Sequence, residues 1–463
     1  MGFGPAGLGL FTAALAAGSF AELMAGDPLV LDRAAGGVGR LGRYAIESDS
    51  FVESFVAAIL ERTDDDDLRP RGPWAEQAVA ELAGQVEARR GGPVPLPWAA
   101  AVQDVLARMV SAEADRLGHP LTVRRRSEVV AARRTRDGTW LVQWRRSDED
   151  GADVLERAEA RNVVLAGGAV QRPADLAGVR LAGVAPWRDL PQRVMGSDEV
   201  LAHGGVDLVR QRLRSARGSP GPRVVIVGGS HSALACATVV LAAHPGPSET
   251  AEPVRTGNPR PVPGEQNGWV TILHRQPLRP MYPSVAQAHA EGFHDFRAED
   301  ICPVTQRVLP LAGFRAASRE LLLRILALGE RPAERRVRLV DLTRTEDTHV
   351  RGLLQAADLV ILATGYRRET VPVFDVDGRP IRLQGEHDHR PHVDERSRVR
   401  TAQGEMVDGL FATGLDTGYP MAGRFGEPSF TGTANGTALW QTTIGTEIVD
   451  QCLARSRAQR GSA

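Results

Sequence analysis

A glycine-rich loop near the start of the chain has the spacing of a dinucleotide-binding site. The stretch GFGPAGLG (2–9) forms a G-x-G-x-x-G pattern, and an apolar helix is expected from Leu8 to about Met24. Such glycines permit a tight turn, a close approach of backbone to a diphosphate, and close packing of helix on strand. The N–H groups at the helix start favour the negative charge. We therefore predict that the diphosphate is bound by Gly2, Gly4, Pro5, Ala6 and Gly7.

An acidic residue at the end of the next strand completes this motif. The segment PLVLDR (28–33) is expected to form a short buried strand, and Asp32 follows its apolar residues. In dinucleotide-binding folds, a carboxylate about 20 residues beyond the glycines binds a ribose hydroxyl. We therefore assign Asp32, with the adjoining Arg33, to the same cofactor site.

A second loop, VVIVGGSHSALA (224–235), has strand, turn and helix within itself. Gly228 would make the turn, Gly229 and Ser230 would approach a phosphate, and Ser232 would begin the helix. A glycine-rich turn without a ligand is the alternative.

The strand expected after this second loop ends in basic residues rather than in an acid. WVTILHRQPLR (269–279) carries Arg275 just beyond its apolar part. An arginine at this point accommodates a 2′-phosphate, whereas an acid would bind the free ribose. This favours NADPH over NADH, the alternative being an ordinary surface arginine in an arginine-rich chain.

The composition excludes several other chemistries. No lysine occurs among the 463 residues, so neither a Schiff base nor the lysine of a P-loop is available. The three cysteines are far apart and form no C-x-x-C pair, which argues against a dithiol or a cysteine zinc site. A net charge of −1 gives no basic footprint for nucleic acid, and no apolar run is long enough to span a membrane. We expect a cytoplasmic protein.

The order of the expected elements indicates an α/β protein with two Rossmann-like dinucleotide-binding domains. An FAD domain would comprise 1–204 and 366–463, and an NADPH domain, 205–365, would be inserted into it. We expect a helical insertion at 44–118 and a β-meander at 125–165 with a turn at Asp137–Gly138. Residues 244–268, rich in proline, glycine and polar residues, are predicted to be a flexible insertion.

Three polar stretches invite other functions. HDHRPH (387–392) carries three histidines without helical spacing or a cysteine partner, so a solvated loop within 386–398 is favoured over a metal site. The acidic run TDDDDLRPRG (63–72) is interpreted as a solvated turn. Residues 228–232 lack the G-x-S-x-G order of a serine hydrolase.

Two later motifs carry a family resemblance. ILATGYR follows an apolar strand after the second loop, and GLFATGLD lies near the C-terminus. With the two glycine loops, these motifs make nearly the whole chain resemble the class B flavin monooxygenases, especially the N-hydroxylating branch that acts on ornithine, lysine and related amines. The resemblance implies further cofactor-binding residues, namely Ala363, Thr364, Gly365, Tyr366, Gly414 and Asp416. It also implies that the helix within 431–454 begins near the flavin.

The resemblance implies a reaction as well. NADPH would reduce FAD, O₂ would add to form a flavin hydroperoxide, and a small nucleophilic substrate, an amine or amino acid, would take the oxygen. Because the cofactors supply this chemistry, no catalytic residue is assigned. Residues 45–51, Tyr366, Arg367 and Tyr419 are candidates for the pocket, with a structural role as the alternative. A homo-oligomer would fit the family.

Two other functions stay open at this point. One is a flavin reductase that passes electrons to an acceptor without oxygen transfer, and the other is a non-catalytic protein with a flavoprotein fold. A buried strand of about five residues would normally precede Gly2, yet only Met1 does. We expect that Met1 is not the true start and that several residues of this strand are missing upstream. The alternative is a real truncation that weakens FAD binding.

Overall fold

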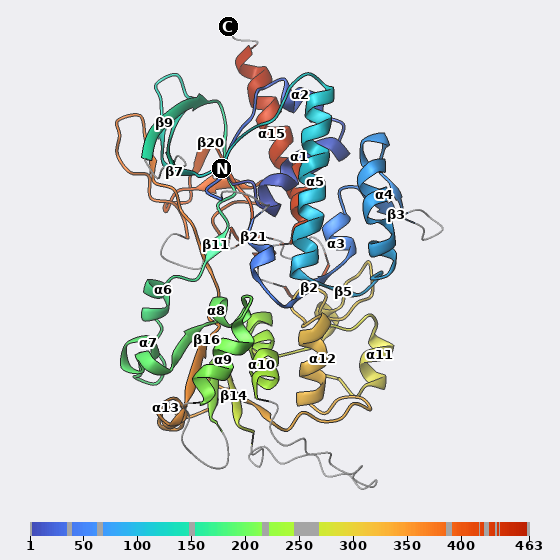
Figure 1. The fold of residues 1–463 in the computed structure, drawn as a ribbon, viewed down its shortest axis with the longest axis vertical. Helices are drawn as coiled ribbons and strands as arrows, with labels where there is room; N and C mark the ends of the chain where they lie inside the picture. The colour runs from blue at the N-terminus through green and yellow to red at the C-terminus, as the bar shows by residue number, and fades with distance from the viewer. Residues whose placement is uncertain are drawn as a thin grey trace.

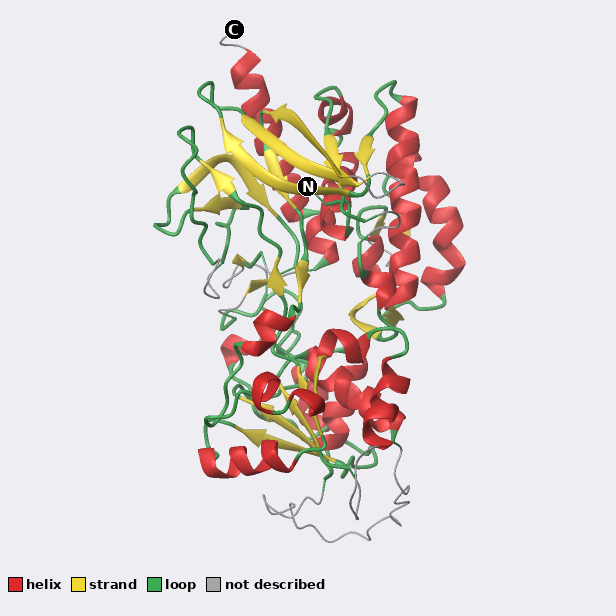
Figure 2. Ribbon diagram, turned by 60° about the vertical axis from the view of Figure 1, so that its left-hand side comes forward, coloured by secondary structure: helices red, strands yellow, loops and turns green. Residues whose placement is uncertain are grey.

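The computed structural model shows two lobes, one above the other in Figure 1, with both termini in the upper lobe. It describes residues 2–34, 39–62, 68–147, 153–214, 222–244, 268–385, 391–415, 417–420, 426–430, 433–434 and 436–460. Figure 2 shows that the strands of the lower lobe lie between helices, whereas the upper lobe has sheets on one side and long helices on the other.

The lower lobe is built on a parallel sheet. Its strands follow the order β12 (Val194–Gly196), β16 (Leu359–Leu362), β13 (Val224–Val227), β14 (Val270–His274) and β15 (Val337–Asp341). Strands β13 and β16 are apolar and buried throughout because helices cover both faces of the sheet. The strand order reverses at β13, the place where doubly wound folds bind dinucleotides.

Helices cover this sheet on both faces. One apolar cluster joins the sheet to α8 (Ser197–Leu201), α9 (Gly205–Arg214), α10 (His231–Ala243) and α12 (Ala316–Ile325). Another cluster joins it to α13 (Asp347–Ala356) and the short helices near it. Strand β12 belongs to this sheet although it precedes residue 205, the predicted start of the second domain. The bounds of the two domains stay a prediction.

The upper lobe holds two short parallel ladders around the first glycine loop. Strand β1 (Leu29–Leu31) pairs with β6 (Thr122–Arg124), and β10 (Val163–Leu165) pairs with β20 (Met406–Ala412). The loop before α1 (Pro5–Ala16) lies between the ends of β1 and β10, because the Gly2 N–H donates to the Leu31 carbonyl at 2.7 Å. A side chain on Gly2 would begin 2.2 Å from the Ala166 oxygen.

The predicted β-meander forms a four-stranded sheet. Strands β7 (Ser127–Arg134), β8 (Trp140–Ser147) and β9 (Asp153–Ala160) are antiparallel, and β18 (Val373–Phe374) joins their edge. Gly138 has the positive φ of 83° that the predicted turn requires. Strand β10 lies outside this sheet, so the meander ends earlier than residue 165.

The chain crosses between the lobes twice, and the two crossings pair with each other. Strand β11 (Ala169–Val170) precedes the lower lobe and β17 (Arg367–Arg368) follows it, and the two form an antiparallel ladder. This arrangement agrees with the insertion of one dinucleotide-binding unit into another.

Part of the expected helical insertion is not helical. The two periodic segments do form α4 (Pro73–Glu87) and α5 (Leu96–Arg116). However, β2 (Glu47–Phe51) pairs with β5 (Pro93–Pro95), and this long-range pairing overrides the helical expectation for residues 47–51.

Two predicted helices are interrupted. The apolar helix expected to run to about Met24 ends at Ala16, and α2 (Phe20–Met24) follows Gly18, whose φ is 72°. Near the C-terminus, α14 (Thr437–Gln441) and α15 (Thr443–Arg460) are separated at Thr442, which has φ −131° and ψ −104°.

The expectation of a solvated loop at 386–398 is wrong for part of its second half, although Glu395 and Arg396 are exposed. His392, Asp394 and Ser397 are buried, because the His392 Nδ1 hydrogen-bonds the Gln384 carbonyl and Asp394 accepts from the Arg398 guanidinium. His387 and His389 lie outside the described residues, as do residues 63–67 of the acidic run and 245–267 of the predicted insertion. Across the described ranges, three or more metal-ligating side chains do not gather at one point. The helices in those ranges are too short or too polar to cross a bilayer.

We predict that His392 makes folding stability fall in acid. Burial lowers the pKa of His392 to about 4. The stabilisation is therefore complete above the unfolded pKa near 6.5 and is lost as the pH falls through 4, up to about 3 kcal/mol. Urea unfolding of wild type and His392→Gln between these pH values should show a weaker pH dependence in the variant. The same change at the exposed His119 should leave the dependence unaltered, and equal slopes in all three proteins would contradict the prediction.

Candidate active site

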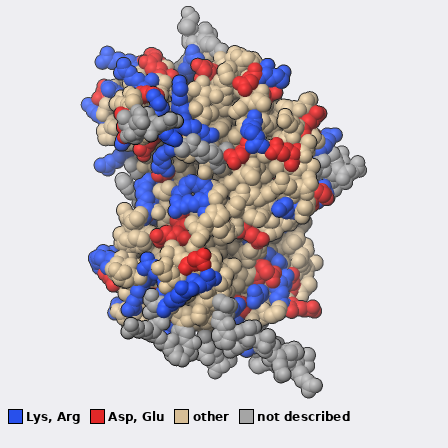
Figure 3. Space-filling view, in the orientation of Figure 1, with Lys and Arg blue, Asp and Glu red and all other residues tan. Residues whose placement is uncertain are grey.

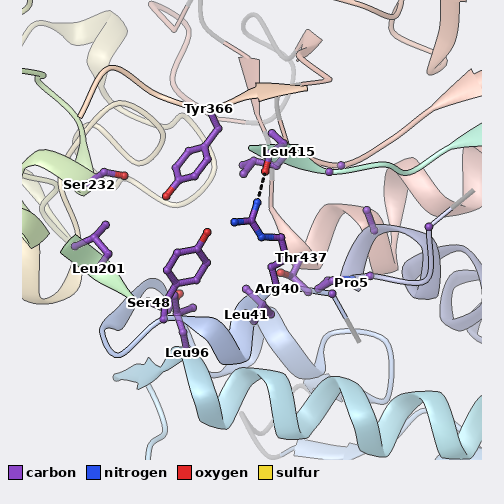
Figure 4. Close-up of a pocket in the computed structure, with 18 of the residues that line it drawn as sticks. Pro5, Arg40, Leu41, Ser48, Leu96, Leu201, Ser232, Tyr366, Leu415 and Thr437 are labelled. Carbon is purple, nitrogen blue, oxygen red and sulfur yellow. Dashed lines mark hydrogen bonds between the residues drawn. The ribbon is translucent and has the colours of Figure 1, made fainter. Parts of the chain in front are cut away.

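A cavity of about 1070 Å³ lies between the first glycine loop and helix α10. In Figure 4, Pro5 and Thr437 lie on one side of it, Leu201 and Ser232 on the other, and Tyr366 and Arg40 between them. Its lining thus comes from both lobes and from segments far apart in sequence. The volume slightly exceeds the usual range for ligand pockets, about 300–1,000 Å³.

The first glycine loop forms one end of the cavity. Gly2, Gly4, Pro5 and Ala6 line it, and Gly7 packs behind them. A side chain on Gly7 would begin 2.0 Å from the Gly2 carbonyl oxygen, so only glycine fits there. No side chain caps the start of α1, so the backbone N–H groups that follow Pro5 in its first turn have no side-chain partner. These features fit a diphosphate.

Asp32 stands beside this loop at the end of β1. Its carboxylate accepts hydrogen bonds from the backbone N–H groups of Phe3 and Ala34, both at 2.8 Å. The same carboxylate lines the cavity, which agrees with a role toward a ribose. Arg33 also lines the cavity and forms a two-pronged ion pair with Glu369.

A buried carboxylate joins the two lobes below the loop. Asp198, on α8, accepts hydrogen bonds from Tyr44 at 2.5 Å and Arg40 at 3.0 Å, and Arg43 lies 3.2 Å away. Burial and the bond to Asp198 raise the pKa of Tyr44 to about 12. Burial likewise raises the pKa of Tyr366, whose hydroxyl hydrogen-bonds Tyr44. Both phenols therefore stay protonated and can donate hydrogen bonds.

A second polar group lies where β2 meets the lower lobe. His231, the first residue of α10, accepts a hydrogen bond at Nε2 from the Arg315 backbone N–H at 3.2 Å. Its Nδ1 faces the Asp49 carboxylate at 3.7 Å, and the Arg315 guanidinium lies 3.5 Å from that carboxylate. Burial lowers the pKa of His231, so the ring is neutral near pH 7.

The cavity brings together about half of the predicted site residues. Those that line it are Gly2, Gly4, Pro5, Ala6, Asp32, Arg33, Ser232, Tyr366 and Gly414. Of the pocket candidate 45–51, residues 45–50 line it as well, and Phe51 does not. Tyr419 is buried and Arg367 is exposed, and neither belongs to the lining. Asp416 lies outside the described residues.

The second glycine loop lies at the end of β13, outside this cavity. Gly229 and Ser230 are exposed, and Gly228 has the positive φ of 148° with its Cβ position 2.2 Å from the Ala363 oxygen. Thr364, Gly365 and Arg275 are likewise exposed and do not line the cavity. The loop and these residues are thus open to a ligand that approaches from the side of the sheet where the strands end.

Sequence reasoning missed several residues of the site. Asp198, Arg40 and Tyr44 meet only after folding, and no local pattern marks them. His231 was considered only as part of a hydrolase motif. The signal that could have found it is its position at the helix start directly after a dinucleotide loop.

Comparison with known proteins supports the class of fold. No protein-family model matches the chain. Over 99% of its length the chain is 28% identical to the CMP-5′-(3-aminopropyl)phosphonate hydroxylase of Streptomyces rubellomurinus, 98% of which is covered. The FAD-bound cadaverine monooxygenase of desferrioxamine biosynthesis from Erwinia amylovora matches with a TM-score of 0.52 at 15% identity, covering 97% of this chain and 92% of that one. Ornithine hydroxylase from Pseudomonas aeruginosa has a TM-score of 0.47 at 15% identity and 98% coverage of both chains.

The chain has the class B flavin monooxygenase fold that its motifs predicted. The chain therefore shares its fold with flavin-dependent monooxygenases and is similar over its full length to a hydroxylase.

We predict that Gly7→Ala impairs flavin binding. The added methyl group would meet the Gly2 carbonyl and displace the loop that lines the cavity. We expect the Kd for FAD to rise at least about tenfold, as measured by fluorescence titration of the flavin. Gly84→Ala, in helix α4 where nothing lies within 4 Å of the new methyl group, is the matched control. Unchanged FAD affinity in Gly7→Ala would show that the loop does not hold the flavin.

We also predict an acid limb in the pH profile that depends on His231. Since its pKa is lowered, the neutral ring persists below the usual value, and protonation at lower pH breaks the bond from Arg315. NADPH oxidation, measured as kcat/KM between about pH 5 and pH 8, should fall toward acid in wild type. His231→Gln, which cannot titrate, should flatten that limb. If kcat/KM fell toward acid as steeply in the variant as in wild type, a group other than His231 would be responsible for the fall.

Proposed function

We propose that the chain is an FAD- and NADPH-dependent monooxygenase that hydroxylates the nitrogen of a small amine. The observation that carries this proposal is an acidic strand facing into a cavity whose other end is a dinucleotide loop. Glu47 and Asp49 alternate on β2, both line the cavity, and Gly2 and Gly4 line its opposite end. An amine cation and an anionic cofactor would thus be held in one space at opposite ends.

The described residues fit a flavin dinucleotide. The uncapped start of α1 offers N–H groups to a diphosphate, and Asp32 is available to a ribose. The indole N–H of Trp440, which also lines the cavity, is buried without a protein partner. A buried donor of this kind is costly unless a ligand or water accepts from it.

For NADPH, the support comes from the second loop. The side chain of Ser230, at the N-cap of α10, forms no capping hydrogen bond, so the first N–H groups of α10 can bind a phosphate. Arg275 is exposed beyond the end of β14, where a 2′-phosphate would lie.

The bound flavin, reduced by the nicotinamide, would supply the activated oxygen. The chain's own residues would then orient the amine. Asp49 and Glu47 would accept hydrogen bonds from it. The neutral His231 adds no positive charge beside Asp49, so the amine would share that carboxylate with the Arg315 guanidinium alone. The protonated phenols of Tyr44 and Tyr366 would close the cavity on the side of the lower lobe. Exclusion of water protects a reactive oxygen species from breakdown.

The substrate tested first should carry an anionic group besides the amine. The relative from Streptomyces acts on a CMP-linked aminopropylphosphonate, and its similarity extends over the full chain. Cadaverine and ornithine, acted on by the two structural neighbours, are the natural comparison substrates.

We predict that Asp49→Asn raises the KM for the amine about ten- to a hundredfold, with NADPH oxidation in the absence of amine unchanged. Product would be measured by mass spectrometry as the gain of one oxygen, and NADPH consumption by absorbance. Glu76→Gln, exposed on α4 away from the cavity, serves as the control. If all consumed NADPH appeared as hydrogen peroxide with every amine tested, the chain would be a reductase or oxidase instead.

A further inference from the structure

A second cavity, of about 490 Å³, adjoins the first. It is bounded by the upper lobe through Arg40 and Arg43 and by the lower lobe through Asp198 and Trp187. Arg33, Arg40, Arg172 and Glu369 line both cavities and form the wall between them. A ligand in the second cavity can therefore reach toward the first past these four side chains.

Arginine dominates the polar lining of the second cavity. Four guanidinium groups, from Arg33, Arg40, Arg43 and Arg172, face three carboxylates, from Asp198, Glu199 and Glu369. Figure 3 shows arginine side chains gathered on this face at the level where the two lobes meet. The local charge is positive although the whole chain carries a net charge of −1.

The carboxylates of this cavity already have partners within the protein. Asp198 accepts hydrogen bonds from Tyr44 and Arg40, Glu199 accepts from the Gly196 N–H at 3.0 Å, and Glu369 is bound by Arg33. These contacts fix the carboxylates in place and leave them with less capacity to bind a cation.

Two arginines keep donors for a ligand. Arg172 approaches Glu369 only at 4.0 Å, which is too far for a hydrogen bond, and half of its side chain is exposed. Arg43 contacts Asp198 through one nitrogen and is also half exposed. Each guanidinium has five N–H donors in a planar fork that matches the oxygens of a phosphate or phosphonate.

An aromatic side chain completes the lining. The half-buried Trp187, in α7 (Pro186–Asp189), borders the same cavity. Nucleobases stack on such rings, and a nucleoside monophosphate is of a size that a cavity of this volume accommodates.

We infer that the second cavity binds a nucleotide-type anion, a phosphate or phosphonate attached to a nucleoside, carried by the amine substrate. Arg43 and Arg172 bind the anion and Trp187 contacts the base. This inference rests on the proposed function, because the nucleotide would be the part of the amine substrate that is bound outside the first cavity. The residues that select the substrate by its nucleotide would therefore lie apart from the first glycine loop.

The test is calorimetric titration of cytidine 5′-monophosphate into the FAD-loaded full-length protein. We expect binding, with a Kd that rises at least about tenfold in Arg172→Ala and in Arg43→Ala. Arg210→Ala, which removes a half-exposed arginine of α9 paired with Asp207, should leave the Kd unchanged. Because Arg43 also holds Asp198, thermal unfolding of each variant would verify that the fold is intact.

Two further titrations identify the ligand. Wild type should bind cytidine 5′-monophosphate more tightly than inorganic phosphate, and Trp187→Leu should narrow that difference. The same titration with NADP⁺ present distinguishes a site for the phosphate of a substrate from a site for the phosphates of the nicotinamide cofactor. Unaltered binding supports a substrate site, whereas displacement by NADP⁺, or a rise in the KM for NADPH in Arg172→Ala, would assign the cavity to the nicotinamide cofactor and overturn the inference.

These results are independent of the proposed reaction. A protein that hydroxylates amines but does not bind cytidine 5′-monophosphate would overturn this inference alone. A protein that binds the nucleotide through Arg172 but hydroxylates no amine would leave the site standing and contradict the proposed function.

Discussion

The arrangement of the site depends on the buried carboxylate of Asp198. Only 7% of this residue is exposed, and a buried charge is tolerated only when it is paired and hydrogen-bonded. Its partners Arg40, Arg43 and Tyr44 all belong to the upper lobe, whereas Asp198 belongs to the lower one. The need to satisfy one charge therefore fixes the segment that begins the cavity lining against the sheet of the other lobe. Arg40 lines both cavities, so this contact borders each of them.

The two ends of the main cavity differ in the kind of group they present. At the glycine loop the lining is backbone, since the absence of side chains at Gly2 and Gly7 lets the loop pack closely against Ala166 and against itself. At the β2 end the lining consists of side chains, which include the carboxylates of Glu47 and Asp49 and the neutral His231. The two ends would therefore meet different parts of a ligand.

The elements that sequence predicted well are those with local signals. Glycine spacing, an apolar helix and a terminal acid located the loop, α1, β1 and Asp32, because each depends on residues near in sequence. The strand β2 was missed because its partner β5 lies about 40 residues away and contains two prolines. The Asp198 contacts were invisible for the same reason, since more than 150 residues separate it from Tyr44. His392 was judged by its polar neighbours, while its burial follows from bonds made in the folded state.

The ladder between β11 and β17 has a mechanical consequence. Because the two connections between the lobes are hydrogen-bonded to each other, they act as one ribbon rather than as two independent linkers. Whatever displaces one connection therefore displaces the other as well, and the lower lobe is held to the upper one through both strands at once.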